Sequence, residues 1–582
     1  MTSLKNRLKK IYSNPTLLEE YEKILNITQS QYYYPVLSLY YHIDNDKIDR
    51  RLMKFQTRYY ISKLLSKNEA IVNNKKTNIF IKSNPIVEPL PYIRGEYSQL
   101  STSYYLSFFY NTLTIHKINN VDNSSYIDAF CSLLCSTLVE NKKCPSFPLF
   151  YDTLSCISEC FRYDISEEYD SICYEEWYLD NVNKKFRLIV EGDTGKHSLI
   201  RRNRNKIHIL QNEKKTNNEF SVIELDTDIL CVNTSVNKNE NNENNDNNEN
   251  NDNIEMEEIH FIEDEVNDLM SLNHIHDSTI ESIINYHNND IHMVDRDMNE
   301  DDINIDNMNM ADSDSSGINS VHSDTNDSCS TDSNPNSNTN IEYFIEIKQF
   351  PTQLLVLEKL DITFTELLEI KKECMELWDC NEILSILFQI CFGLSVVQKE
   401  YYLVHNDLHA SNIMFKETNK KYLYYSYHQV YYRIPTYGKI TKIIDFGRAT
   451  FYYKKRFFVS DTFRKNGDAE GQVSYPFKKN RKNNVIPNRS FDLSLLAITI
   501  QTYFNDSENK NNIYKDINKL LIRWTTNKYG ETITECDTFD MYLKIAKTVD
   551  NAIPINQLND KIFQRFIVKK RDIPKNEWIY YL

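Results

Sequence analysis

The chain has 582 residues and a net charge of −16 at pH 7, and a chain of this length can bury a core that needs no disulfide or metal staples. Its 12 cysteines form no C-x-x-C pair and have no histidine cluster at zinc spacing, so we expect reduced thiols and no zinc site. The N-terminal stretch MTSLKNRLKK lacks the apolar core of a secretory signal, and no run of about 18 apolar residues follows. We therefore expect a cytoplasmic protein without a membrane span.

The acidic residues are concentrated in one segment. Between residues 238 and 340, 26 Asp and Glu stand against two basic residues, so a local charge of −24 leaves +8 for the rest of the chain. Stretches such as KNENNENNDNNENNDN contain few large apolar side chains and cannot offset the entropy of ordering. We expect residues 235–340 to be a disordered acidic insert, either a docking region for a partner or an insertion without a role. The basic remainder suits a phosphate-bearing ligand or an acidic partner.

The region before the insert is predicted to be rich in strands. We expect residues 1–75 to form an N-terminal helical extension and residues 76–234 to form a sheet-based lobe with insertions. Three stretches rich in β-branched and aromatic residues read as strands: NIFIKS (78–83), TLTIHKI (112–118) and FPLFYDTLSCI (147–157). Between the last two, SSYIDAFCSLLCSTLVE (124–140) has apolar residues at helical spacing, and Asn123 is a candidate N-cap.

After the insert the pattern changes from strand to helix. TQLLVLEKL (352–360) is an apolar strand that turns acidic, and two helical patterns follow it, TFTELLEIKKECMELW and NEILSILFQICFGLSVVQKE. KKYLYYSY and VYYRIPTYGKITKIID alternate like a long hairpin, and the chain from about residue 490 onward reads as mostly helical. This order predicts an α+β fold with two lobes, in which residues 341–582 complete the small β-rich lobe and form a hinge and a larger helical lobe.

Two short motifs carry the chemistry. LVHNDLHASNIMF (403–415) places Asp407 five residues before Asn412, and KIIDFGRAT (442–450) ends an apolar strand at Asp445, followed by Phe446 and Gly447. Phosphoryl transfer needs a carboxylate near the acceptor hydroxyl and oxygen ligands for a Mg²⁺ ion that bridges the phosphates. Asp407, Asn412 and Asp445 are residues of the required types. We expect Gly447 to provide a backbone conformation that is closed to other residues.

With these motifs the chain resembles the protein-kinase superfamily, specifically the kinase-like proteins of nucleocytoplasmic large DNA viruses, the giant viruses. Further stretches similar to that group are IFIKSNPIVEPLPYIRGEY, NSSYIDAFCSLLCSTL, SDTFRKNGDAEGQ and PNRSFDL. The resemblance runs discontinuously from about residue 79 to 500 and leaves out the acidic insert. It implies ATP and Mg²⁺ as cofactors, a protein substrate, and a location in the cytoplasm of an infected cell or in the virion.

Carried over position by position, the resemblance implies Asp407 as the catalytic base and Asn412 and Asp445 as Mg²⁺ ligands. His405 would support the catalytic loop. Asp492, in SFDL, is similar to the aspartate that holds this loop's backbone from a helix.

The nucleotide contacts are expected around Glu358 and Leu360, where the resemblance places the hinge. Protein kinases also cover the phosphates with a glycine-rich loop, but this chain has no glycine before Gly95. Two lysines compete to pair with the phosphates, and we favour Lys82. Lys82 lies in IFIK, which resembles V-A-I-K, and Lys117 in TIHK follows Gly95 at a kinase-like distance.

The partner of that lysine is either Asp128 or Glu140, both in the predicted helix.

Other positions depart from the family pattern: Asn406 stands where regulated kinases have an arginine, His409 replaces a lysine near the transferred phosphate, and no A-P-E follows D-F-G.

Three functions remain open. The first is a serine/threonine protein kinase. The second is a small-molecule phosphotransferase of the aminoglycoside or choline kinase type, because H-x-D-L-H-x-x-N also resembles those enzymes. The third is a catalytically silent scaffold. D-F-G favours the first over the second, and the retention of Asp407, Asn412 and Asp445 together favours an enzyme over a scaffold. The tyrosine-rich strands carry little interleaved Arg or Lys, so we expect no nucleic-acid partner.

Overall fold

The structure is a computed structural model that describes residues 8–41, 50–97, 112–192, 341–373, 379–465, 467–472, 487–504, 512–534 and 539–582. These residues all belong to one of the two compact units into which the chain divides, residues 1–231 together with 340–582. The predicted disordered insert lies outside the described residues.

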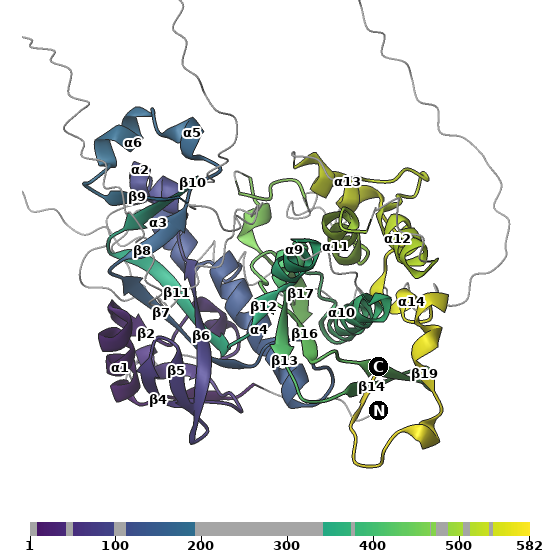
Figure 1. Ribbon diagram of the computed structural model, residues 1–582. Coiled ribbons are helices and arrows are strands. Elements are labelled where there is room, and N and C mark those ends of the chain that lie inside the picture. Colours follow the sequence, from purple (N-terminus) through teal and green to yellow (C-terminus); the bar gives the residue numbers. More distant parts are fainter. Residues whose placement is uncertain are drawn as a thin grey trace, which may run out of the picture. The chain divides into compact units, whose positions relative to one another are not determined.

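The largest sheet has six strands, all antiparallel to their neighbours, in the order β2-β7-β11-β6-β5-β4 (Figure 1). The bounds are Ile27–Gln31 for β2, Phe150–Ser158 for β7, Phe350–Glu358 for β11, Lys75–Pro85 for β6, Glu69–Val72 for β5 and Ile61–Ser66 for β4. The predicted strands at 78–83, 147–157 and 352–360 are confirmed as parts of β6, β7 and β11.

The central strands of this sheet are buried on both faces. Helix α1 (Pro15–Leu25) packs against β2 and β4, and α4 (Ser124–Glu140) packs against β7 and β11. On β11, Leu354 and Val356 belong to the apolar cluster of α1, whereas Leu355 and Leu357 belong to the cluster of α4. Because side chains alternate across a strand, β11 contributes to two separate cores.

Helix α4 begins and ends where the sequence predicts. The Asn123 side chain caps it by accepting a hydrogen bond from the Ser125 N–H at 3.0 Å, which satisfies one of the backbone donors at the helix start. Most of its side chains are buried, so the helix is held by packing on nearly every side.

The remaining helices include α10, the longest described, which is embedded in the core. It spans Cys380–Tyr401 and is apolar and long enough to cross a membrane, yet 94% of its most apolar stretch is buried inside the protein. It packs against α14 and against strands β15 and β16, as a core helix does. The other α-helices are α2 (Pro89–Arg94), α3 (Thr112–Asn119), α5 (Tyr169–Ile172), α6 (Glu176–Asn181), α9 (Phe364–Glu373), α11 (Phe491–Gln501), α12 (Asn512–Thr525), α13 (Asp540–Thr548) and α14 (Pro554–Gln557).

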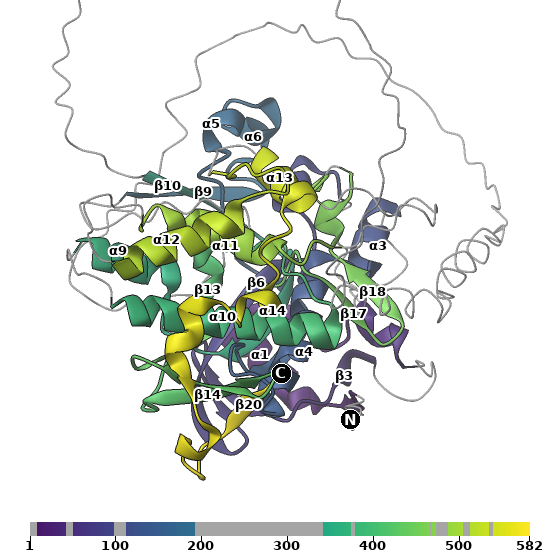
Figure 2. The same cartoon turned by 90° about the vertical axis from the view of Figure 1, so that its right-hand side faces the viewer.

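Smaller sheets surround this core, in the orders β8-β10-β9, β12-β13-β16, β19-β15-β14-β20, β1-β3 and β17-β18. Strand β20 lies beside β14 in parallel, although the two are far apart in the sequence (Figure 2). The bounds are Lys10–Tyr12 (β1), Met53–Phe55 (β3), Phe161–Asp164 (β8), Phe186–Gly192 (β9), Ile341–Ile347 (β10), Ile362–Thr363 (β12), Ile413–Glu417 (β13), Tyr422–Tyr427 (β14), Val430–Pro435 (β15), Lys439–Ile443 (β16), Thr450–Tyr453 (β17), Arg456–Val459 (β18), Ile567–Val568 (β19) and Ile579–Tyr581 (β20).

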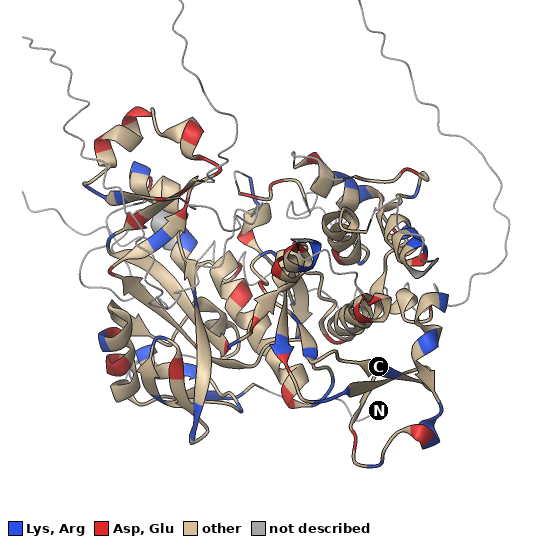
Figure 3. Ribbon diagram, in the orientation of Figure 1, with Lys and Arg blue, Asp and Glu red and all other residues tan. Residues whose placement is uncertain are grey.

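Charged residues of both signs are interspersed over the described elements (Figure 3). On α9, Glu366 lies in the first turn and Lys371 and Lys372 lie in the last, an arrangement that complements the helix dipole.

Two predictions about the part of the chain before the insert are wrong. The described part of residues 1–75 is not a helical extension, because it contains one α-helix and its strands β2, β4 and β5 belong to the six-stranded sheet. The stretch 112–118, predicted as a strand, is helix α3. A short apolar run fits either period, and here tertiary packing selects the helix.

Candidate active site

The loop that contains Asp407 is built around a buried histidine. His405 Nε2 donates to the Ile444 carbonyl at 2.8 Å, and its Nδ1 accepts from the Asp407 N–H at 3.3 Å. Since a carbonyl can only accept, the ring must carry its proton on Nε2. The histidine thus joins the Asp407 loop to the end of β16, next to Asp445.

A fully buried carboxylate fixes the backbone of the same loop. Asp492, in the first turn of α11, accepts from the His405 N–H at 3.0 Å and from the Asn406 N–H at 2.9 Å. Asn406 has φ of 63°, a left-handed conformation that Asn tolerates better than most residues. Burial raises the pKa of Asp492, against the lowering influence of His405 and the two N–H groups. These contacts fit the supporting roles predicted for His405 and Asp492.

Asp407 and Asn412 lie together. The Asn412 side-chain N–H donates to the Asp407 carbonyl at 2.9 Å, which closes the loop on itself. The Asp407 carboxylate accepts at Oδ1 from Arg448 Nη1 and from the Tyr542 hydroxyl, both at 3.2 Å. Two donors on one oxygen fix the orientation of this carboxylate.

The charges around Asp407 keep it ionised. Burial alone would raise the pKa of Asp407, but the Arg448 guanidinium and the hydrogen bond from the Tyr542 hydroxyl lower it below its ordinary value. Burial also lowers the pKa of His409, and this influence outweighs the attraction of Asp407. His409 is therefore neutral at pH 7.

Asp445 follows β16 in a left-handed conformation, with φ of 67°. Its Oδ1 accepts from Lys82 Nζ at 2.9 Å. The expectation for Gly447 is wrong in its physical reason, because Gly447 lies outside the left-handed region and Asp445 occupies it instead. An Asp there carries backbone strain that the surrounding contacts must offset.

Strand β6 directs Lys82 toward α4. Ile79 and Ile81 face the cluster of α1, so the alternating residues Lys82 and Asn84 face α4. Lys82 Nζ lies 2.6 Å from Asp128 Oδ2, and Asn84 Nδ2 donates to the same oxygen at 2.8 Å.

The other oxygen of Asp128 reaches the D-F-G turn. Asp128 Oδ1 accepts from the Phe446 N–H at 2.9 Å. Lys82 therefore bridges Asp128 and Asp445, and all three side chains are buried. Burial by itself would lower the pKa of Lys82, but the two carboxylates outweigh it and raise the pKa, so the ammonium remains charged.

The competing candidates lie elsewhere. Lys117 is in helix α3 and pairs with Glu88 and with Asp461. Glu140 is the last residue of α4, and its Oε1 accepts from Ser136 Oγ at 3.0 Å. Of the two lysines and the two acids, the structure thus brings Lys82 and Asp128 to Asp445.

The predicted hinge lies at the end of β11. Glu358 Oε2 accepts from the Leu149 N–H and pairs with Lys442 Nζ, each at 3.2 Å. The side chain of Glu358 is thereby engaged within the protein, so the predicted nucleotide contact would have to come from its backbone. Leu360 is buried just after the strand.

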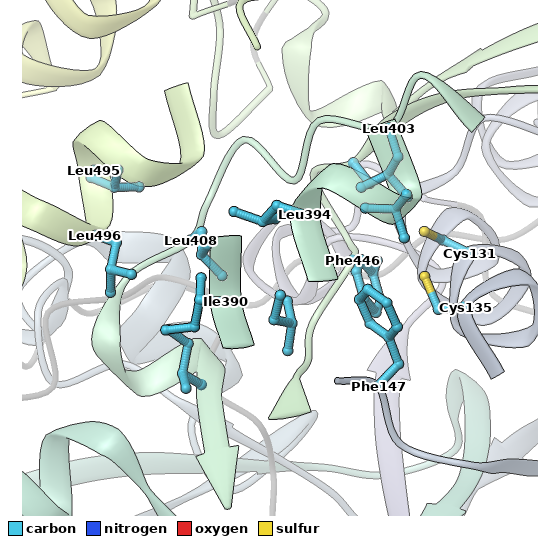
Figure 4. Close-up of a cluster of buried hydrophobic side chains, with 14 of the residues drawn as sticks. Cys131, Cys135, Phe147, Ile390, Leu394, Leu403, Leu408, Phe446, Leu495 and Leu496 are labelled. Atoms are coloured by element: carbon cyan, nitrogen blue, oxygen red, sulfur yellow. The ribbon is translucent and has the colours of Figure 1, made fainter. Parts of the chain in front are cut away.

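An apolar cluster lies beneath the site. In Figure 4, Phe446 and Phe147 lie close together, next to Cys131 and Cys135 of α4. The centroids of the two phenyl rings are 6.2 Å apart. The His405 ring is 5.2 Å from that of Phe446. This packing anchors the D-F-G turn between the Asp407 loop and α4.

Several contacts of the site were not predicted from the sequence. Arg448 and Tyr542 bind Asp407, Asn84 binds Asp128, and Gln472 Nε2 donates to the Asn406 carbonyl at 2.6 Å. Arg448 directly follows D-F-G, so its place in the chain could have suggested it. Tyr542 comes from a distant helix, and no local pattern indicates it.

No family model matches the chain, but it is similar to two curated protein kinases. It is 40% identical over 62 residues to the serine/threonine-protein kinase haspin of Mus musculus, covering 11% of this chain and 8% of haspin. It is 29% identical over 219 residues to a protein of Acanthamoeba polyphaga mimivirus provisionally named as a serine/threonine-protein kinase, covering 34% of this chain and 49% of that one. In these segments the chain resembles proteins of the protein-kinase superfamily.

The chain spans at most about half the length of these protein-kinase relatives. A solved structure of vaccinia related kinase 3 is 15% identical and overlaps 36% of this chain and 60% of its own, with a TM-score of 0.20. At that score the overlap adds nothing to the assignment. The giant-virus resemblance in the sequence agrees with the mimivirus match.

Proposed function

We propose that this protein transfers the γ-phosphoryl group of ATP to protein hydroxyls in the presence of Mg²⁺, as a serine/threonine protein kinase without a glycine-rich loop. One observation carries the proposal: Lys82 bridges Asp128 of α4 and Asp445 of the D-F-G turn. This geometry matches the lysine-acid pair that protein kinases need in place for transfer.

The donor set fits a metal bound together with phosphates. Among the described residues, no three His, Cys, Asp or Glu side chains lie close enough to form a metal site by themselves. Mg²⁺ in phosphoryl-transfer sites is commonly held by one or two protein oxygens plus phosphate oxygens and water, so Asp445 and Asn412 suffice as its protein ligands. Bound there, Mg²⁺ would neutralise charge on the phosphates.

The other side chains have separate tasks in this proposal. Asp407 orients the acceptor hydroxyl and takes its proton, and the low pKa caused by Arg448 keeps it ionised for that purpose. Lys82 places a positive charge for the phosphates, and Asp128 holds it in position. The backbone from Glu358 to Leu360 would contact the nucleotide base.

The proposed fold has the two lobes of a protein kinase. The six-stranded sheet with α1 and α4 would form the small lobe, and α9–α14 would belong to the large one. The proposed domain limits change accordingly, because the small lobe begins before residue 76. Cytoplasmic location in an infected host cell and partner docking through the acidic insert remain proposals drawn from the resemblance and the composition.

The test is a transfer assay with Mg²⁺ and labelled ATP. We expect the purified chain to phosphorylate itself or a generic acceptor protein, and Asp445→Ala to abolish the transfer. Asp560→Asn is the matched control, because Asp560 pairs with Arg523 of α12 rather than with the site. Undiminished transfer by Asp445→Ala refutes the assignment.

Two further measurements, transfer to small-molecule acceptors and the effect of ATP on the melting temperature, distinguish the proposed kinase from the other two functions. Choline or aminoglycoside acceptors labelled in preference to protein would identify a small-molecule phosphotransferase. A rise in melting temperature with ATP and Mg²⁺, but without transfer to any acceptor, would identify a scaffold that binds nucleotide.

A further inference from the structure

A second buried carboxylate, Asp461, connects the segment after D-F-G to the start of α4. It is the first residue of the 3₁₀-helix η5 (Asp461–Phe463) and is 7% exposed. Its Oδ2 lies 2.7 Å from Lys117 Nζ and accepts from Asn120 Nδ2 at 3.2 Å. Its Oδ1 accepts from the Ser124 N–H, the first residue of α4, at 3.0 Å.

The backbone and a second ion pair reinforce this attachment. The Asp461 N–H donates to the Asp122 carbonyl at 2.8 Å. Arg456, on β18, donates to the Asp122 side chain at 2.9 Å. Arg456 and Asp461 are thus joined to the end of α3, to the connection that follows it and to the first residue of α4.

The charges at this junction favour its formation. Burial by itself would lower the pKa of Lys117, but Asp461 and Glu88 outweigh it and raise the pKa. The ammonium therefore stays charged next to Asp461. The carboxylate also lies at the N-terminus of a 17-residue helix, where the helix dipole attracts negative charge.

The junction lies one helical turn from the proposed active site. Asp461 holds the N–H of Ser124, and Asp128, four residues further along α4, holds Lys82 and the Phe446 N–H. Four residues make about one turn of an α-helix, and the N–H(i)→O=C(i−4) bonding of a helix links the backbone of Ser124 to that of Asp128. Movement of the first turn would therefore displace Asp128.

The hydroxyls beside Asp461 are already occupied. Ser460 Oγ accepts from the Thr462 N–H at 3.4 Å and from Thr462 Oγ1 at 3.0 Å. Ser460 is 1% exposed and Thr462 is 8% exposed. A phosphate added to either residue would require this turn to open first.

We propose that Asp461 is a positioning residue: its fixed carboxylate holds the start of α4 through Lys117, Asn120 and the Ser124 N–H, and so keeps Asp128 in reach of Lys82. The negative charge that an added phosphate can supply in regulated kinases is here part of the chain. The segment after D-F-G then needs no phosphorylation to hold α4. The effect on transfer rests on the proposed function, whereas the effect on α4 does not.

The test compares Asp461→Asn with the native protein by two measurements. The first is hydrogen exchange of the amides at the start of α4, residues 124–128, and the second is kcat and KM for ATP. We expect faster exchange of these amides and a fall in kcat of about tenfold or more, since a buried bond to a charged group is lost. Asp379→Asn is the matched control, because Asp379 caps the N-terminus of α10 and accepts from the Asn381 N–H. This variant should change neither the exchange of residues 124–128 nor kcat.

A second variant and a phosphatase treatment complete the test. Lys117→Met should give the same direction of change, and the double variant should lose less than the sum of the single losses; it also serves if Asp461→Asn does not fold. Phosphatase-treated native protein should keep its activity.

The proposal is overturned if exchange at residues 124–128 is unchanged in both single variants, if exchange rises while kcat stays within twofold, or if phosphatase abolishes activity. If the native protein transfers no phosphate, the proposed function fails, and hydrogen exchange alone decides whether Asp461 holds α4.

Discussion

Replacing Asp128 by Asn should break the centre of the proposed site, and the structure sets the size of the effect. The carboxylate accepts from Lys82 and Asn84 at Oδ2 and from Phe446 N–H at Oδ1. An amide has one oxygen and one NH₂ group, so in either orientation at least one buried donor meets another donor. Each buried donor left without an acceptor lowers the free energy of unfolding by about 1–3 kcal/mol. Lys82 still has a carboxylate partner, because its Nζ lies 2.9 Å from Asp445 Oδ1. We expect the free energy of unfolding to fall by about 2–4 kcal/mol.

The assay is urea unfolding followed by tryptophan fluorescence, with Trp524 fully buried as a reporter. Glu140→Gln is the control on the same helix, since Glu140 accepts from Ser136 Oγ rather than from Lys82, and a change within about 0.5 kcal/mol is expected for it. Transfer should fall at least about tenfold in Asp128→Asn only, because Lys82 loses its fixed position. Equal losses of stability and activity in the two variants would refute the assignment of Asp128 as the partner of Lys82.

Two further predictions concern a charge and a close contact. Arg448→Met should remove the main influence that lowers the pKa of Asp407, so the acid limb of kcat/KM should move to higher pH. The ionised Asp407 stabilises the native fold above the pKa that this carboxyl has in the unfolded chain, and this contribution is lost on acidification. The difference in free energy of unfolding between native protein and Arg448→Met should therefore widen from about pH 3 to pH 7, reaching about 3–5 kcal/mol. An unmoved acid limb would contradict this. Gly393→Ala should lower the melting temperature, because the new Cβ would lie 2.9 Å from Ser146 Cβ; overpacking costs about 1–3 kcal/mol against about 1 gained in helix propensity. Ser146→Gly should relieve the loss, and a higher melting temperature in the single variant would show that the core can adjust.

The sequence determined those features that depend on neighbouring residues. Asp407 and Asn412 lie in one loop, and the Asn412 amide reaches the Asp407 carbonyl. Helix α4 was predictable with its Asn123 cap, because apolar spacing and capping chemistry act over a few residues. The strand before Asp445 was equally evident from its apolar run. The roles of these residues in phosphoryl transfer are still proposals.

Only the tertiary structure decided which lysine and which acid meet. Lys82 and Lys117 both follow short apolar runs, and Asp128 and Glu140 lie on the same helix. Apart from the resemblance of IFIK to V-A-I-K, which favours Lys82, nothing local distinguishes them, because the choice depends on which face of β6 meets which turn of α4. Tyr542 reaches Asp407 across 135 residues of sequence. Short-range patterns determine helices, strands and loops, whereas ion pairs between distant segments exist only after packing has fixed the orientation of each element.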